Sequence, residues 1–252
     1  MIIDVPKYAL VFFRVLAILW LLPIFSMRSI SVIFKVGLAL LTAFLIADVV
    51  SYPGGLDADP YALLLAIFRE VLIGLSIGFA IRLLFMVVQA AGEIMSYQTG
   101  FAFARVIDPF TSMQSSVLEQ FLYLLGIMIF FSVDGHHIVV RGLYASFKEL
   151  PLGTATFTAG LFNYLATATG RIFSLGLKFG APLVVALLLI ELSLGLLSRM
   201  IPTMNIFVEG LPVKVFVSLT VLSLALGFMA PALAGMFRGI DAEYFRVLRL
   251  LR

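Results

Sequence analysis

The chain contains no cysteine, so disulfide bonds, thiol catalysis and zinc sites of the cysteine type are excluded. Charged residues are also scarce, since they make up 12% of the 252 residues, against about 25% in an ordinary soluble domain. Hydrophobic residues make up 62%, more than a water-covered surface allows. This composition indicates a protein of a membrane or membrane complex. Its length suits one helical domain over residues 1–252, with no separate catalytic domain.

Basic residues are too thinly spread to form a nucleic-acid surface. The net charge is +3, and the short basic run is "FRVLRLLR" at residues 245–252. A basic tail beside a membrane typically lies at the anionic cytoplasmic leaflet. We therefore expect membrane lipid, and no nucleic acid, among the partners of this chain.

Hydropathy predicts about six apolar segments of roughly the 20 residues that a bilayer requires. They lie at residues 8–25, 32–50, 61–91, 117–133, 170–197 and 213–236. We expect the first to be a membrane segment and not a cleaved signal peptide, because no small-residue cleavage site follows it. The intervening charges do not follow the positive-inside rule, since Asp48, Asp57 and Asp59 would share a side with the basic tail. A plain six-span bundle therefore describes this chain poorly.

One stretch is too long for a bilayer. No proline interrupts the helical pattern between Pro60 and Pro109. A helix of roughly 45 residues extends about 70 Å, more than twice the bilayer core of about 30 Å. Either the helix breaks near a glycine, or it leaves the lipid and remains apolar because other subunits cover it. The second alternative implies an assembly.

Polar residues gather on one face of this predicted helix. At about 100° per residue, the members that lie within roughly 40° of one line are Gly78, Arg82, Gln89, Glu93, Ser96 and Gly100. Arg82 and Glu93 are about three turns apart, too far for a direct ion pair. A charge at the bilayer centre costs roughly 2.5–3.5 kcal/mol, so each needs a partner from another helix. Candidates within the chain are Arg14, Lys35, Glu119 and Glu191.

The alternative to partners within the chain is a polar seam that faces neighbouring subunits or a pore. We predict that its members are Arg82, Gln89, Glu93, Gln98, Gly100 and Glu191. Glu191 lies deep in the apolar run "LLLIELSLGLL". An isolated acid inside a membrane either serves a proton relay or pairs with another group across a subunit interface. The sequence leaves both roles open.

Small residues predict close contacts between helices. Gly74 with Gly78, and Gly176 with Gly180, form two G-x-x-x-G motifs, which let helix backbones approach closely. The first motif reads "GLSIG" and also matches the G-x-S-x-G pattern of a nucleophilic serine. That pattern requires a strand-to-helix turn, whereas Ser76 lies in the middle of a predicted helix. We therefore predict close packing and no catalytic residue.

Two adjacent histidines follow an aspartate in "SVDGHHIVV". Asp134, His136 and His137 together suggest a metal site. Neighbouring residues on a helix point about 100° apart, however, which suits binding of one metal badly. We favour a loop or helix-start role with a hydrogen-bonded histidine, and we predict no metal and no cofactor.

Several motifs occur in a specific order across nearly the whole chain. They are "RVLAILWLLPIF", "EVLIGLSIGFAIRLLF", "AGEIMSYQTGFAFARVIDP", "DGHH", "SFKELPLG" and "LLSRMIPTMNIFVEGLPVK". In order and spacing these motifs resemble the FliR family, the flagellar member of the type III export-gate proteins, which has injectisome relatives. The resemblance implies an all-α protein of long helical hairpins, similar to a fusion of the FliP and FliQ folds. Its helices would extend beyond the bilayer plane.

The resemblance further implies a non-enzymatic subunit of the flagellar export gate, in the bacterial inner membrane at the flagellar basal body. FliP and FliQ homologues would complete the pore, a FlhB-type switch protein would contact it, and unfolded flagellar proteins would pass through it. In the family, the loop after the "DP" element occludes the closed channel. Here this plug comprises Asp108, Pro109, Phe110, Met113 and Gln114. Proline ends a helix, and phenylalanine and methionine supply a bulky ring and a pliable thioether.

Two other functions stay open from the residues alone. A secondary transporter or ion channel would use a midplane site around Arg82, Glu93 and Glu191, and would work alone or as a homo-oligomer. An intramembrane hydrolase would use Ser76. Purification distinguishes these functions, because an export-gate subunit should be unstable alone and co-purify with two smaller hydrophobic proteins.

Overall fold

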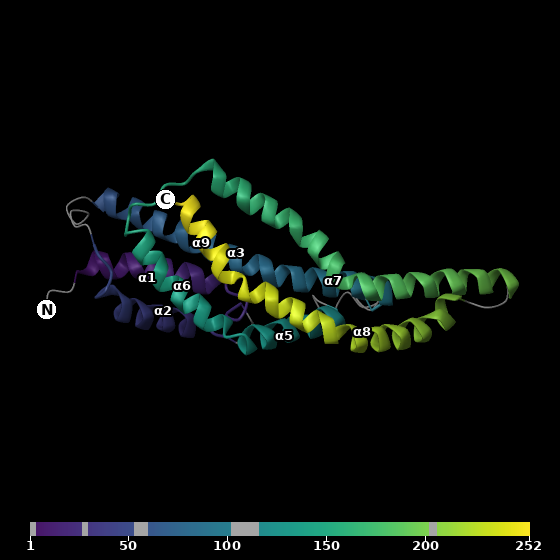
Figure 1. Cartoon of the computed structure of the whole chain (residues 1–252). Coiled ribbons are helices and arrows are strands. Elements are labelled where there is room, and N and C mark those ends of the chain that lie inside the picture. The colour runs from purple at the N-terminus through teal and green to yellow at the C-terminus, as the bar shows by residue number, and fades with distance from the viewer. Residues whose placement is uncertain (1–3, 27–29, 53–59, 102–115, 202–205) are drawn as a thin grey trace. The chain divides into compact units, whose positions relative to one another are not determined.

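The computed structural model describes residues 4–26, 30–52, 60–101, 116–201 and 206–252, and every regular element in these ranges is an α-helix (Figure 1). The helices are α1 (Val5–Leu21), α2 (Val32–Ala47), α3 (Pro60–Thr99), α5 (Val117–Ser132), α6 (Gly135–Glu149), α7 (Ala159–Met200), α8 (Ile206–Arg238) and α9 (Ile240–Leu250). The predicted all-α class is confirmed. The similarity to a fusion of the FliP and FliQ folds stays a prediction.

Fewer helices can span a membrane than the six apolar segments suggest. By length and composition, three described stretches qualify, namely α3, α7 and the run of α8 and α9 from Glu209 to Leu250. The pair of α5 and α6, bent by 67° at its break, would make a fourth if it is one span. The two N-terminal helices have only 17 and 16 residues. Within the described residues, this count agrees with the expectation that a plain six-span bundle describes the chain poorly.

The long helix predicted after Pro60 is confirmed. α3 continues through 40 residues without a break, which corresponds to about 60 Å. α7 has 42 residues, or about 63 Å. No glycine within these 40 residues of α3 breaks the helix. The helix ends instead at Gly100, whose φ of 93° is typical of the residue that terminates a helix.

The chain forms two compact units. Unit 1 comprises Met1–Leu83, Asp134–Thr169 and Arg238–Arg252, and unit 2 comprises Leu84–Val133 and Gly170–Phe237. α3 and α7 contribute residues to both units. The single domain expected over residues 1–252 stays a prediction.

Unit 1 is held together by α1, which packs on the first half of α3. Its buried residues Val11, Val15 and Ile18 follow helical spacing and form one apolar stripe. Facing them, Ile73 and Ile77 of α3 are fully buried. α1 also packs on α2, and α6 packs on α9. This unit therefore has a continuous apolar core into which few polar groups enter.

Unit 2 contains a cluster of aromatic rings from α3, α5 and α8. The ring centroid of Phe85 lies 5.4 Å from that of Phe130 and 4.9 Å from that of Phe237. α5 begins with a capping box, in which Ser116 accepts a hydrogen bond from the backbone N–H of Glu119 and the Glu119 carboxylate accepts one from the backbone N–H of Ser116. The cluster and the cap together fix the start and the packing of α5.

Burial differs sharply among the three long apolar stretches. The most apolar part of α3 is 56% buried, whereas the corresponding parts of α7 and of the α8–α9 run are 22% buried. Most residues in these parts of the two latter stretches are therefore not buried, and α7 exposes large apolar side chains such as Leu189 at 61% and Leu192 at 66%. In an aqueous medium that exposure is unfavourable, so lipid or other protein must cover these helices.

Candidate functional site

A buried ion pair joins α1, α3 and α6 in unit 1. Arg14 and Glu70 are both fully buried, and Arg14 Nε donates to Glu70 Oε2. Arg14 Nη1 donates to the carbonyl oxygens of Ser146, at 3.0 Å, and Leu150, at 3.1 Å. Glu70 Oε1 accepts from the backbone N–H of Gly153 at 2.8 Å. The pair thus crosslinks two long helices to the segment at the end of α6.

The guanidinium of Arg14 also lies against an aromatic ring. Its Cζ is 4.4 Å from the ring centroid of Phe147, a distance at which cation–π attraction is favourable. Burying two charges carries a large desolvation cost, which is repaid only with good geometry and additional hydrogen bonds. Hydrogen bonds satisfy Arg14 Nε and Nη1 and both Glu70 oxygens, whereas Arg14 Nη2 has no hydrogen-bond partner among the described residues. The sequence named Arg14 as a partner for the polar stripe of α3, but missed Glu70, whose signal was a carboxylate inside the apolar run "AIFREVLIG".

A second charged cluster joins α3, α7 and α8 in unit 2. Lys214 Nζ donates to Glu191 Oε1 at 2.5 Å, and Gln98 Nε2 donates to Glu191 Oε2 at 3.2 Å. All three residues are half-buried. The side chain of Glu191 is 39% accessible to solvent, and that of Lys214 is 23% accessible. The structure therefore shows Glu191 paired within its own chain. Sequence reasoning missed Lys214, although "GLPVK" places a single cation near the start of an apolar helix.

The remaining members of the predicted seam lie along α3. Arg82 and Glu93 are exposed, whereas Gln89 and Gly100 are half-buried. Arg82 and Glu93 stand about 16 Å apart along the helix axis, which agrees with the expectation that they do not pair with each other. Of the seam, Gln98 and Glu191 are the two that share a hydrogen bond. A role of these residues at a subunit interface stays a prediction.

The other proposed intrachain partners have contacts elsewhere. The Nζ atom of Lys35 lies 5.2 Å from the ring centroid of Trp20, and Glu119 forms the cap of α5. Lys35 thus contacts a residue of the neighbouring helix α1, and Glu119 contacts a residue at the start of its own helix. Predicting them would require knowing which helices are adjacent.

Three of the four motif glycines lie where two helices approach closely. A Cβ atom on Gly74 would lie 2.5 Å from the carbonyl oxygen of Arg14, and one on Gly78 would lie 2.9 Å from Leu21 Cβ. In unit 2, a Cβ on Gly176 would lie 2.9 Å from Ala90 Cβ. Gly180 has more room, since its nearest neighbours would be 3.7 Å away.

Ser76 lies in the middle of α3, where its hydroxyl donates to the carbonyl oxygen of Leu72 at 2.8 Å. The hydroxyl group of Ser76 is therefore hydrogen-bonded within its own helix. Nucleophilic serines of the G-x-S-x-G type require a sharp strand-to-helix turn. The position of Ser76 does not supply that geometry.

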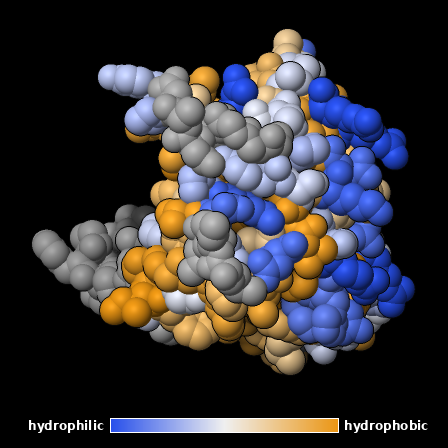
Figure 2. Space-filling model, turned by 90° about the vertical axis from the view of Figure 1, so that its left-hand side faces the viewer, coloured by the Kyte–Doolittle hydropathy of each residue, from blue (hydrophilic) through white to orange (hydrophobic). Residues whose placement is uncertain are grey.

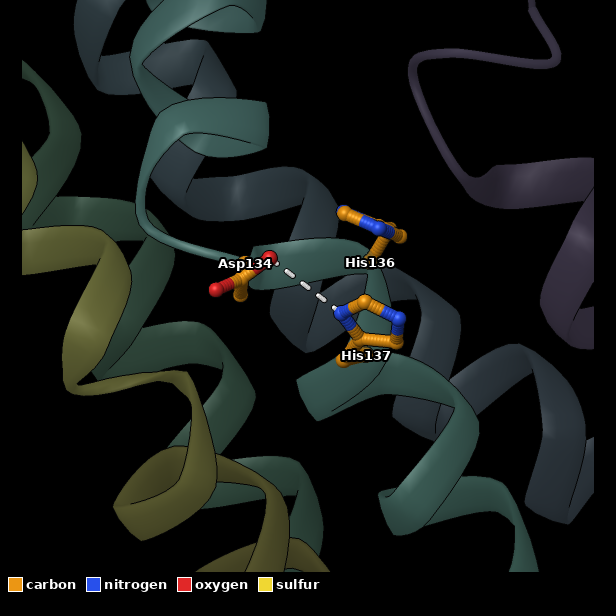
Figure 3. A group of neighbouring side chains, drawn as sticks. All are labelled: Asp134, His136 and His137. Atoms are coloured by element: carbon orange, nitrogen blue, oxygen red, sulfur yellow. Dashed lines mark hydrogen bonds and ion pairs between the residues drawn. The ribbon is translucent and has the colours of Figure 1, made fainter.

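Asp134, His136 and His137 lie together at the break between α5 and α6 (Figure 3). The expectation that the two rings point apart is wrong, because their centroids are 4.1 Å from each other. One ligand atom of each residue lies within 4.8 Å of the others. His137 Nδ1 is 3.2 Å from Asp134 Oδ1, the contact expected for a histidine at a helix start. All three sit at the N-terminus of α6, whose dipole disfavours a cation.

The predicted plug lies outside the described residues. Asp108, Pro109, Phe110, Met113 and Gln114 all fall within residues 102–115. The plug therefore stays a prediction, placed between the end of α3 and the cap of α5.

Long apolar helices, internal ion pairs and exposed apolar surface together define an integral membrane protein of the all-α class. The sequence pattern of the family described as "Bacterial export proteins, family 1" matches residues 5–240. The chain belongs to this family.

Curated relatives agree with this assignment. The flagellar biosynthetic protein FliR of Bacillus subtilis (strain 168) is 33% identical over 240 residues, which cover 94% of this chain and 92% of the relative. FliR of Escherichia coli (strain K12) is 34% identical over 235 residues, or 93% and 88% of the two chains. The Yop proteins translocation protein T of Yersinia pestis is 28% identical over 210 residues, or 82% and 80%. The family identity predicted from the motifs is confirmed.

Proposed function

We propose that this chain is a non-enzymatic subunit of the flagellar type III export gate. With FliP and FliQ homologues it forms the bacterial inner-membrane pore through which unfolded flagellar proteins leave the cell, at the flagellar basal body. The observation that carries the proposal is the similarity to FliR proteins along nearly the whole chain. A FlhB-type switch protein is a further partner. The role requires no metal and no cofactor.

The lengths of the helices support a role inside an assembly. α3 and α7 have 40 and 42 residues, so each is about twice as long as the bilayer core of about 30 Å is thick. Lipid can cover only part of α7, whose apolar surface is largely exposed. Sister subunits that pack on the part of the helix outside the bilayer would explain why a helix longer than the bilayer core stays apolar.

Charge supports the same conclusion. Arg82 is exposed on an apolar helix, where contact with lipid would cost roughly 2.5–3.5 kcal/mol. A neighbouring subunit with complementary groups removes that cost. We therefore propose that the α3 face with Arg82, Gln89 and Glu93 is a subunit interface.

The segment after α3 is proposed as the plug of the closed pore. It would lie between a helix end at Gly100 and a capped helix start at Ser116. Phe110 and Met113 would fill the channel by apolar contact, which blocks ions yet yields to a passing polypeptide chain.

Conductance of the assembled complex tests the plug. Deleting residues 110–115 should raise ion conductance above the closed level in planar bilayers, because the bulky side chains leave the channel. A double variant F110G/M113G should do the same, whereas the matched variant T111G/S112G should stay closed. Closed-level conductance in both the deletion and F110G/M113G would show that the plug assignment is wrong.

A transporter with a midplane site is less well supported. Such a site needs Glu191 available to a substrate or proton, whereas its carboxylate is bound by Lys214 and Gln98. The family consists of bacterial export proteins. We therefore retain the export function.

A further inference from the structure

A cavity of about 370 Å³ opens in unit 1 beside the end of α6 and the end of α9. Its lining residues are Glu149, Phe245, Leu248, Arg249 and Arg252. The volume falls within the range of about 300–1,000 Å³ that is typical of small-molecule sites.

The lining combines groups of three kinds. Arg249 and Arg252 supply two guanidinium groups, whose planar fork of N–H donors matches the oxygens of a phosphate. Glu149 supplies one carboxylate, which repels a purely anionic ligand and attracts an ammonium group. Leu248 is buried and Phe245 is 39% exposed, so one wall of the cavity is apolar. The cavity thus suits a ligand with a phosphate, an ammonium group and an apolar extension.

The place of α9 in the sequence, directly after an apolar run, suggests where such a ligand comes from. Between Lys214 and Arg238, the run of α8 contains no charged residue and has the length of a bilayer core, about 34 Å. α9 begins two residues after Arg238. Helix ends of this kind, with exposed aromatic and basic side chains, lie among lipid head groups.

The same unit presents an apolar surface that lipid can cover. α2 exposes large apolar side chains, among them Ile33 at 85%, Phe44 at 61% and Leu45 at 66%. Figure 2, which faces the left-hand side of Figure 1, shows hydrophilic side chains gathered along the right-hand side of the view and hydrophobic ones over its central and lower part. Unit 1 therefore carries both a surface for acyl chains and a charged cavity.

We propose that this cavity binds the phosphoethanolamine head group of a membrane phospholipid. The phosphate lies on Arg249 and Arg252, the ammonium group lies on Glu149, and the glycerol end lies against Phe245 and Leu248. Glu149 distinguishes the ligand from phosphatidylglycerol, which has no ammonium group, and from phosphatidylcholine, whose ammonium carries no N–H donor. The proposal goes beyond the export function and depends only on the location of the chain in a membrane.

Lipid titration of the complete export complex tests the site. The chain is co-expressed with its companion subunits, purified in detergent and delipidated. Short-chain phosphatidylethanolamine, phosphatidylcholine and phosphatidylglycerol are added separately, and bound lipid is counted by native mass spectrometry. Free phosphoethanolamine is a further arm, because it separates a lipid ligand from a soluble one. We expect phosphatidylethanolamine to bind about tenfold more tightly than the other three probes.

Three variants decide the assignment. R249Q/R252Q should lower the affinity for phosphatidylethanolamine at least about tenfold, since two charge-assisted contacts to phosphate are lost. E149Q should remove the preference over phosphatidylglycerol. R246Q is the matched control, because Arg246 lies over the ring of Tyr164 at 5.7 Å and does not line the cavity. It should bind lipid as the wild-type complex does.

Several results would overturn the proposal. Equal losses in R246Q and R249Q/R252Q would show a general charge effect. Free phosphoethanolamine binding as tightly as the lipid would indicate a soluble ligand. Failure of any lipid to bind, with an acidic segment of a companion subunit crosslinked to Arg249, would show a protein contact. The mass of the intact complex verifies assembly in each variant, so the export function is judged separately.

Discussion

At the scale of single residues, the best-defined feature is the buried contact between Arg14 and Glu70. Its two members lie on α1 and α3, and their other partners, among them the Ser146 carbonyl and the Gly153 N–H, lie in the segment at the end of α6. A charge left alone in such a place is strongly destabilising, whereas two apolar side chains of similar size are often tolerated. The pair therefore fixes which helices meet more than it adds to net stability.

Replacing one member of the pair should cost much more stability than replacing both members by apolar side chains. R14M leaves the Glu70 carboxylate buried without its cation, and we expect a loss of about 3–5 kcal/mol in the free energy of unfolding. The double variant R14M/E70M should recover most of that loss, because no buried charge remains. Denaturant unfolding of the purified complex measures both effects.

Arg141 offers a matched control on the surface. It is exposed on α6, so R141M should change the free energy of unfolding by no more than about 0.5 kcal/mol. If R14M behaves like R141M, the ion pair does not contribute as the structure indicates.

The sequence showed that charges enter the apolar runs, but not how they pair. Arg14 and Glu70 are 56 positions apart, and their contact exists only because α1 packs on α3. The close approach at Gly74 makes that packing possible. Pairing of this kind depends on helix adjacency, which neither periodicity nor composition contains.

At the scale of elements, the sequence predicted which helix is continuous better than it predicted where helices end. The absence of proline after Pro60 predicted one long helix, and α3 is continuous. Its end at Thr99 follows from the left-handed conformation of Gly100, ten positions before the expected limit at Pro109. Hydropathy alone did not separate spanning helices from shorter ones, because α1 and α2 are apolar but have only 17 and 16 residues.

The contact of α7 with α8 gives a prediction at this scale. K214M should leave Glu191 with its hydrogen bond from Gln98 and without a cation. Because both charges are partly exposed, we expect a loss of roughly 1 kcal/mol, between the values for surface and buried pairs. The melting temperature of the complex should fall accordingly, and the double variant K214M/E191M should restore it.

Lys178 supplies the comparison on α7. It is exposed, and K178M should leave the melting temperature of unit 2 unchanged unless a companion subunit binds there. A fall with K178M equal to that with K214M, and no recovery in K214M/E191M, would contradict a specific role for the Glu191–Lys214 pair.

At the scale of the whole molecule, the class and the family could be predicted because both depend on features spread along the chain. Composition requires a nonaqueous surrounding, and the ordered motifs are long enough to identify relatives. The division into two interleaved units was not predictable, since each long helix passes from one unit to the other. Which surfaces are covered by lipid and which by protein depends on chains other than this one.

The exposed surface leads to the last prediction, which concerns stability outside the assembly. A chain whose α7 and α8–α9 stretches are 22% buried, and whose helices are about twice as long as a bilayer core is thick, cannot be covered by lipid alone. Expressed by itself in detergent, it should therefore aggregate or be degraded. Expressed with its FliP and FliQ homologues, it should accumulate and co-purify with both.

A charge reversal at Arg82 tests whether the α3 face is the surface on which the companion subunits bind. R82E places an acid where the proposed interface meets its partner, so it should lower the yield of the co-purified complex several-fold. R141E, on the exposed face of α6, is the matched control and should leave the yield unchanged. A chain that is monodisperse and stable alone, with R82E and R141E indistinguishable in the complex, would mean that the long helices need no companion. Arg82 would then have to be solvated by water, and a self-sufficient membrane bundle would replace the gate subunit.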